Sequence, residues 1–235
     1  MVYYFTAKIT RKDNDSDSYI TTDPPKTQEY KIYMGKDKFE NVPLIKHSHP
    51  KNIWFHVDNL SSAHIYLQLT KPEILSWKSF DQFQIEEELL SQLCQLTKAN
   101  SIKGNKLNNV TIIYTPVENL HTDGSMDAGT VEYVNPKLLK RFNVAKKENA
   151  VLNKLNKTKT EGSTEEFVKN QQDFANEMAN ERKLQEREEE RLSKQWQEEK
   201  KSKNDPYADL FSAENIQSSR NNRRAADWED EDDFW

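Results

Sequence analysis

The apolar residues of this chain are distributed unevenly, and most of them lie before residue 145. The chain has 235 residues, only 34% of them are hydrophobic, and its mean hydropathy is −1.00. A sequence this polar cannot pack along its whole length around one core, because folding requires enough apolar surface to bury. We therefore expect one folded domain over residues 1–144, a helical segment over 145–203 and a disordered acidic tail over 204–235.

The first 144 residues combine several strand-like stretches with one clear helix. β-branched and aromatic residues predict strands at 2–9, 30–34, 53–57, 65–69, 110–114 and 129–134, with an edge strand at 140–144. A segment rich in Asp, Ser, Asn and Thr predicts a mobile loop at 10–29. Apolar residues recur every three or four positions over 84–100, which predicts the main helix, and a shorter helix is expected at 41–47. The predicted fold class is α+β: a single domain with a largely antiparallel sheet and one main helix.

The segment after residue 144 is strongly charged. Residues 137–159 contain eight basic residues and one acidic residue, Glu148, and we expect a helix over 145–159. A second helix is expected from Thr164 to about Lys203. Its apolar positions lose the heptad register, which favours a solvated single helix over a self-associating coiled coil. We interpret this helix as a docking segment for a protein partner.

The acidic tail contains two groups of apolar residues that could anchor it on a partner. They are Tyr207, Leu210 and Phe211 in the first group and Trp228, Phe234 and Trp235 in the second. Apolar anchors among acidic residues are typical of peptides that fold on binding. The alternative is that these side chains have no function.

Several functions are disfavoured by what the sequence lacks. The single cysteine, Cys94, cannot form an intramolecular disulfide, which favours a reducing compartment, and no stretch is long and apolar enough to span a membrane. We expect a cytoplasmic or nuclear protein. The turn at Gly35 lacks the pattern of a phosphate-binding loop, and no nucleophile motif surrounds Ser61 or Ser62. We therefore expect no catalytic activity and no cofactor.

Four histidines lie close together in the sequence, at 47, 49, 56 and 64, so a metal site has to be considered. Nothing in their spacing fixes three of them around one point, and we predict no metal. Strand alternation places Trp54 and His56 on one face of the sheet and Ile53, Phe55 and Val57 on the other.

A set of short motifs spans residues 1–140. They are Gly35-Lys36-Asp37, Glu40-Asn41, Leu44-Ile45-Lys46, Ile53-Trp54-Phe55-His56-Val57-Asp58, Ser61-Ser62-Ala63-His64, Lys98-Ala99-Asn100-Ser101, Val110-Thr111-Ile112-Ile113-Tyr114-Thr115 and Met126-Asp127-Ala128-Gly129-Thr130-Val131. Together they resemble the NFACT-R domain, in the form of its stand-alone eukaryotic members. In large multidomain members this domain is part of ribosome-associated quality-control factors that bind transfer RNA. The resemblance implies nucleic-acid binding without catalysis.

The candidate nucleic-acid contacts combine these motifs with nearby lysines. They are Gly35, Lys36, Asp37, Asn41, Lys46, His56, Asp58, Ser61, Ser62, His64, Lys98, Lys103, Lys106, Lys146 and Lys147. Lysines that neutralise phosphates give salt-sensitive, sequence-tolerant affinity. Our hypothesis is an RNA-binding adaptor that recognises transfer RNA or ribosomal RNA. The alternatives are a protein-interaction module that docks through helix 164–203 and the tail, and a DNA-binding protein.

Overall fold

The chain begins with a long antiparallel strand pair, β1 (Val2–Arg11) and β2 (Lys26–Gly35), in which Val2 lies opposite Gly35. The computed structural model describes residues 1–11, 26–123 and 125–204. Residues 26–29 belong to β2, although the sequence pattern predicted a mobile loop there. Polar residues are tolerated because this end of the pair is solvated, as the exposed Lys8–Glu29 ion pair at 2.7 Å shows. The centre of the expected loop lies outside the described residues.

One seven-stranded sheet forms the framework of the domain. Its order is β8 (Lys140–Val144), β5 (Val110–Pro116), β3 (Ile53–Val57), β4 (Ile65–Gln68), β2, β1 and β9 (Thr160–Gly162). Every neighbouring pair is antiparallel, which confirms the predicted α+β class. The expected edge strand at 140–144 is present.

The strand expected at 129–134 is not part of this sheet. Only β7 (Glu132–Tyr133) is extended, and it pairs with β6 (Leu120–His121) in a separate two-stranded sheet. The positive φ of 80° at Gly129 and a turn in which Thr130 N–H donates to the Asp127 carbonyl interrupt the extended backbone. The apolar composition of this stretch was therefore misleading.

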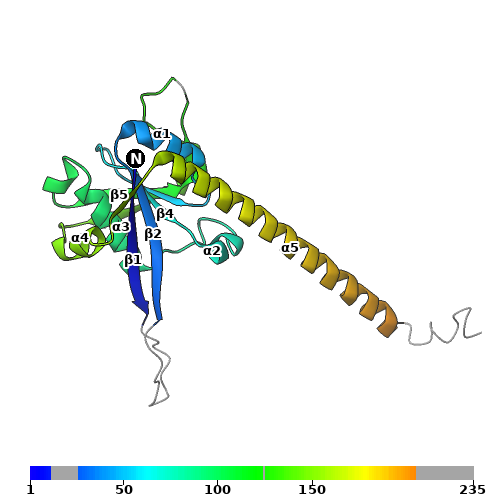
Figure 1. Cartoon of the computed structure of the whole chain (residues 1–235). Coiled ribbons are helices and arrows are strands. Elements are labelled where there is room, and N and C mark those ends of the chain that lie inside the picture. The colour runs from blue at the N-terminus through cyan, green and yellow to red at the C-terminus, as the bar shows by residue number, and fades with distance from the viewer. Residues whose placement is uncertain (12–25, 124, 205–235) are drawn as a thin grey trace, which may run out of the picture. The chain divides into compact units, whose positions relative to one another are not determined.

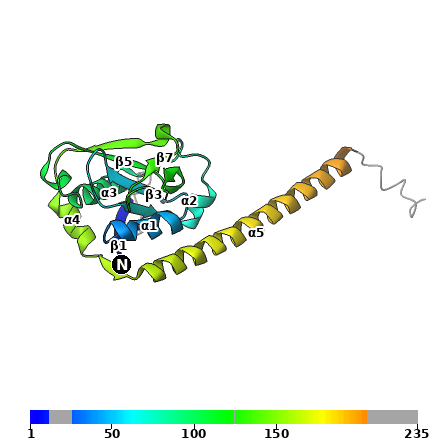
Figure 2. The ribbon, with the colours of Figure 1, turned by 90° about the horizontal axis from the view of Figure 1, so that it is seen from above.

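The described residues contain five α-helices (Figures 1 and 2). They are α1 (Lys38–His47), α2 (Lys71–Leu75), α3 (Glu87–Ala99), α4 (Asn149–Asn156) and α5 (Thr164–Asn204), with 3₁₀ turns η1 (Gly104–Lys106), η2 (Val117–Asn119) and η3 (Pro136–Leu138). α3 begins three residues later than predicted. The helix expected over 145–159 is shorter, because its C-terminal end leads into β9, which pairs with the start of β1.

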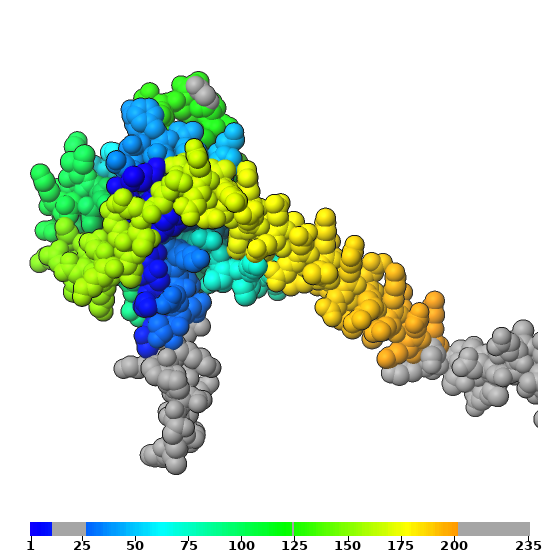
Figure 3. All heavy atoms as spheres, viewed as in Figure 1, coloured from blue at the N-terminus to red at the C-terminus, as the bar shows by residue number. Residues whose placement is uncertain are grey.

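Both faces of the sheet are covered. Phe5, Phe55 and Ile65 pack on one face against α3 and α4, where Cys94 is also buried. Tyr33, Trp54 and Tyr66 lie in the second core, together with residues of α1 and Phe167 of α5. Figure 3 shows α4, β9 and the first turns of α5 next to the start of β1, at the edge of the sheet where β9 pairs with β1. The alternation predicted for Trp54 and His56 against Ile53, Phe55 and Val57 is confirmed.

The packed unit extends beyond residue 144. Residues 1–179 form one compact unit and residues 180–235 a second. Leu152, Leu155 and Phe167 are buried in the first unit, so α4 and the start of α5 belong to its core. In the second unit, residues 180–204 are helical, and Leu184, Leu192 and Trp196 are 63%, 53% and 63% exposed.

Two further expectations concern the C-terminal part and the membrane. The tail anchors Tyr207, Leu210, Phe211, Trp228, Phe234 and Trp235 lie outside the described residues. Within the described ranges, no helix is long and apolar enough to cross a membrane.

Candidate nucleic-acid interface

Three aromatic rings meet on the face of the sheet that carries α1. His56 stacks on Trp54 with a centroid distance of 5.3 Å and an interplanar angle of 4°. His64 meets Trp54 edge-on at 5.2 Å and meets His56 edge-on at 5.3 Å. Two of the predicted site residues, His56 and His64, are therefore in direct contact, and Trp54 forms the buried base of the cluster.

Burial keeps both imidazoles neutral at neutral pH. Desolvation, with a smaller contribution from His56, lowers the pKa of His64 to about 3. Desolvation also lowers the pKa of His56, partly opposed by its hydrogen bond at Val57 and by the charge of Asp58. Neutral imidazoles offer hydrogen bonds rather than positive charge. This cluster is thus suited to recognising polar groups and not to neutralising phosphates.

Four buried polar atoms of this face and of α1, which covers it, have no hydrogen-bond partner among the residues that the structure describes. They are Asn41 Oδ1, Trp54 Nε1, His64 Nδ1 and Tyr66 Oη. Buried polar groups are normally satisfied by protein, water or ligand, and an unsatisfied group costs about 1–3 kcal/mol. These atoms lie inside the packed face and are closed to an external ligand, so an enclosed water molecule is what would satisfy them.

Asp58, Tyr133 and Arg141 border the histidine cluster. Arg141 Nε lies 3.5 Å from Asp58 Oδ2, and the Tyr133 ring lies 6.1 Å from the Trp54 ring. The sheet register explains the position of Arg141, because Ile113 is opposite both His56 and Arg141. Arg141 was missing from the sequence-predicted site. The predicted edge strand at 140–144 contains Arg141, but only the β5–β8 register places its exposed guanidinium beside the histidines.

The motif around Gly35 also lies on this face. Asp37 caps α1, its carboxylate accepting from the N–H groups of Phe39 and Glu40 at 2.9 and 3.1 Å. Gly129 packs against the start of the same helix, since a Cβ there would lie 2.9 Å from the Lys38 carbonyl oxygen. Val131 and Tyr133 join the same core as Leu44 and Trp54. The motifs at 35–41, 54–58 and 127–131, far apart in sequence, therefore share one face.

The two serines of the predicted site support the backbone. Ser62 Oγ accepts a hydrogen bond from the Val57 N–H at 3.1 Å. The Ser61 carbonyl accepts from Ser101 Oγ at 2.7 Å, and Ala63 N–H donates to the Asn100 carbonyl. These bonds hold the connector before His64 in place. Ser62 takes part through its hydroxyl, whereas Ser61 takes part only through its main-chain carbonyl and its side chain is exposed.

Lys98, one of the predicted phosphate contacts, is buried with an exposed fraction of 0%. Its Nζ donates to the carbonyl oxygens of Leu107 and Val144. Desolvation lowers its pKa. The prediction for Lys98 is corrected: its ammonium group holds two chain segments together inside the domain.

The remaining predicted lysines are exposed. Lys36 lies just before α1 and Lys46 in its last turn, so these two are far apart along the helix. The others form one group, Lys103, Lys106, Lys146 and Lys147, which flank the two segments joined by Lys98. The Asn109 N–H donates to the Ala145 carbonyl at 2.8 Å, which further fixes these segments to each other. The structure thus brings lysines that are distant in sequence to one end of the domain.

No group of three or more His, Cys, Asp or Glu side chains in the described part of the chain is arranged to hold a metal ion. The histidine cluster consists of rings packed against Trp54, with His56 stacked on the indole and His64 edge-on to it. Its geometry suits ring stacking and hydrogen bonding.

Comparison with known proteins places these features in a family. Residues 1–135 match the family described as "NFACT protein RNA binding domain". The chain is 40% identical over 219 residues to Coiled-coil domain-containing protein 25 of Bos taurus, covering 92% of this chain and 98% of that protein. It is 47% identical over 143 residues to the Mus musculus protein of the same name, covering 61% and 65%. A Dictyostelium discoideum homologue is 44% identical over 131 residues, covering 56% and 60%. The chain therefore belongs to the family of the NFACT protein RNA binding domain.

Proposed function

We propose that this protein is a non-catalytic RNA-binding adaptor that acts in the cytoplasm and contacts transfer RNA or ribosomal RNA. The observation that carries the proposal is the fixed group of exposed lysines at 103, 106, 146 and 147. Lys98 holds their two segments together from inside the domain. Family membership supports RNA as the ligand. A role in ribosome-associated quality control is part of the same proposal.

The two surfaces of the site have different chemistry. The lysine group supplies positive charge for phosphates, which gives affinity without sequence information. In the cluster of Trp54, His56 and His64, His56 is the partly exposed member, and it presents a neutral imidazole beside the Arg141 guanidinium. Such groups suit contacts to bases or 2′-hydroxyls, which distinguish RNA from DNA.

The test is equilibrium binding of the whole protein to transfer RNA over a series of salt concentrations. Reversal of Lys103, Lys106, Lys146 and Lys147 to Glu should weaken binding and make the salt dependence shallower, by roughly 0.7 to 0.9 in log–log slope for each phosphate that is no longer neutralised. The matched control reverses four exposed lysines elsewhere, Lys78, Lys169, Lys183 and Lys201, which changes the net charge equally. An equal reduction of affinity in both variants would mean that only overall charge matters, and it would overturn the proposed surface.

A second candidate function is protein docking through residues 180–204. Leu184, Leu192 and Trp196 are more than half exposed on this charged helix. Single exposed apolar side chains are common on protein surfaces, whereas three large ones on one helix support a docking surface. Binding of a protein partner that survives nuclease treatment and requires these three residues would favour this function. Equal affinity for double-stranded DNA and for RNA in the salt series would favour the DNA-binding alternative.

A further inference from the structure

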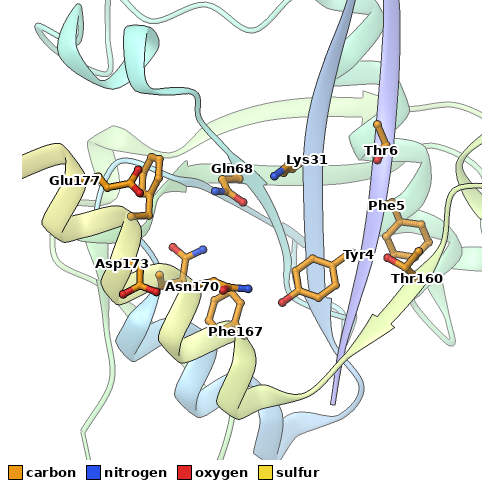
Figure 4. Close-up of a pocket in the computed structure, with 12 residues that line it drawn as sticks. Tyr4, Phe5, Thr6, Lys31, Gln68, Thr160, Phe167, Asn170, Asp173 and Glu177 are labelled. Carbon is orange, nitrogen blue, oxygen red and sulfur yellow. The ribbon is translucent and has the colours of Figure 1, made fainter. Parts of the chain in front are cut away.

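A cavity of about 600 Å³ lies between the sheet and the first turns of α5. All its lining residues fall within the compact unit of residues 1–179. Figure 4 shows Tyr4, Lys31 and Gln68 on the strand side, facing Asn170 and Asp173 of α5. This volume is within the range of about 300–1,000 Å³ typical of pockets for small organic groups. The lining of the cavity shares no residue with the lysine group or with the ring cluster of Trp54, His56 and His64.

One buried polar atom in the cavity wall lacks a partner among the described residues. Gln171 lines the cavity, its side chain is only 6% exposed, and its Oε1 is the atom without a hydrogen bond there. An amide oxygen buried in this way costs about 1–3 kcal/mol unless water or a ligand donates to it. By contrast, the next residue, Gln172, is exposed to solvent. The wall of the cavity therefore includes a buried amide whose oxygen has no donor among the described residues.

The other lining groups define the chemistry of that ligand. Gln68, Asn170 and Gln171 each carry an amide that can donate and accept. The half-buried Tyr4 ring offers an aromatic surface, and its pKa is raised by burial and by Glu166, which keeps the phenol neutral. Proteins recognise an unpaired base in two ways. Hydrogen-bonding groups such as amides pair with its polar edge, and an aromatic ring stacks on its face.

The charged groups of the wall argue against a free phosphate or carboxylate as the ligand. Asp173 and Glu177 face Lys31 across the cavity, and Glu177 is also paired with Lys71 at 2.7 Å. Two carboxylates and one ammonium in the wall would repel a multiply charged anion. A neutral, planar ligand with both donors and acceptors fits the wall best.

We propose that this cavity binds one unpaired nucleobase of an RNA ligand, with its polar edge on the amides of Gln171 and its neighbours and its face against Tyr4. This proposal rests on the proposed RNA-binding function and adds to it a further contact that does not depend on charge. The cavity makes the protein prefer RNA with an unpaired nucleotide over a fully paired duplex. The lysine group, which contacts phosphates, does not make this distinction.

The test uses the whole protein and two RNA probes: a short single strand of mixed sequence, and the same strand annealed to its complement. Gln171→Leu removes the amide with little change in volume. It should lower affinity for the single strand by roughly tenfold, as expected for removal of about 1.4 kcal/mol of hydrogen bonding. Affinity for the duplex and the salt dependence should remain as in the wild type. Gln172→Leu, the exposed neighbour, is the matched control and should change neither.

The possible outcomes separate this proposal from the function on which it rests. Wild-type affinity of Gln171→Leu for the single strand, with RNA binding otherwise intact, overturns the cavity proposal and leaves RNA binding in place. Absence of binding to both probes by the wild type overturns both. An equal reduction of affinity for both probes means a general structural defect and also rejects a base-specific contact. Unfolding in urea shows whether the variant is folded, and removal of an unsatisfied amide should leave its stability unchanged or higher.

Discussion

The ammonium group of Lys98 donates to the main-chain carbonyl of Val144, 46 residues further along the chain. It also donates to the Leu107 carbonyl, so one buried charge joins the end of α3, the segment after η1 and the end of β8. This arrangement positions the exposed lysines on both segments while Lys98 itself remains out of reach of a ligand. Lys98, which the sequence suggests as a phosphate contact, therefore supports the segments that carry the proposed contacts.

Lys98→Met should destabilise the fold without directly removing a ligand contact. Methionine keeps the length of the side chain but leaves the buried Val144 carbonyl and the part-buried Leu107 carbonyl without this donor, which should lower the free energy of unfolding by about 1–3 kcal/mol. Lys103→Met, at an exposed position, should change stability by less than about 0.5 kcal/mol. Urea unfolding measures both. A Lys98→Met protein of wild-type stability that loses RNA affinity would instead place Lys98 at the interface.

The burial of His64 makes stability depend on pH. Its ordinary pKa is 6.5 and its pKa in the fold is about 3, so the unfolded chain binds a proton at a higher pH than the folded chain does. The stabilisation is fully present above 6.5 and is lost as pH falls from 6.5 towards 3. Between about pH 7 and about pH 5, His64 alone should lower the free energy of unfolding by about 2 kcal/mol. His56, whose pKa is also lowered, acts in the same direction.

The measurement compares urea unfolding of the wild type and of His64→Leu at these two pH values. Leucine cannot titrate, so the variant should lose less stability between them than the wild type does. The difference between the two losses isolates His64 from the carboxylates, which titrate in both proteins. If the two proteins lose the same amount, His64 is not buried in its neutral form.

Local sequence patterns predicted the helices and strands whose conformation is determined by their own residues. The opposite faces of Trp54 and Phe55 follow from strand alternation, and the apolar period of α3 is visible in its sequence. The sequence did not reveal which distant segments pair with each other. Thr160–Gly162 has no strand-like composition, and it is extended because it pairs with Val2–Tyr4 at the sheet edge. Arg141 joins the site for the same reason, through the register of β5 and β8.

Gly35 and Asn41 should show coupled effects on stability. A Cβ at position 35 would lie 2.6 Å from Asn41 Oδ1, so Gly35→Ala should cost about 1–3 kcal/mol through overpacking. Asn41→Ala removes the atom that clashes, and the double variant should therefore be more stable than the sum of the single effects predicts. A double-mutant cycle in urea measures this coupling. Strict additivity would show that the backbone around α1 moves and that the two side chains do not meet.

The exposed apolar residues of the second unit should contribute to docking and not to folding. Leu184→Ala, Leu192→Ala and Trp196→Ala remove side chains that are more than half exposed, so each should change the free energy of unfolding of the first unit by less than about 0.5 kcal/mol. The Trp196 ring contacts Lys200 Nζ, at 5.0 Å from the ring centre, and removal of this local contact should affect only the helix. RNA affinity should remain unchanged in the triple variant, while nuclease-resistant binding of a protein partner should disappear. A triple variant that retains its partner would move the docking surface away from residues 180–204, whereas one with weakened RNA affinity would make this helix part of the RNA site.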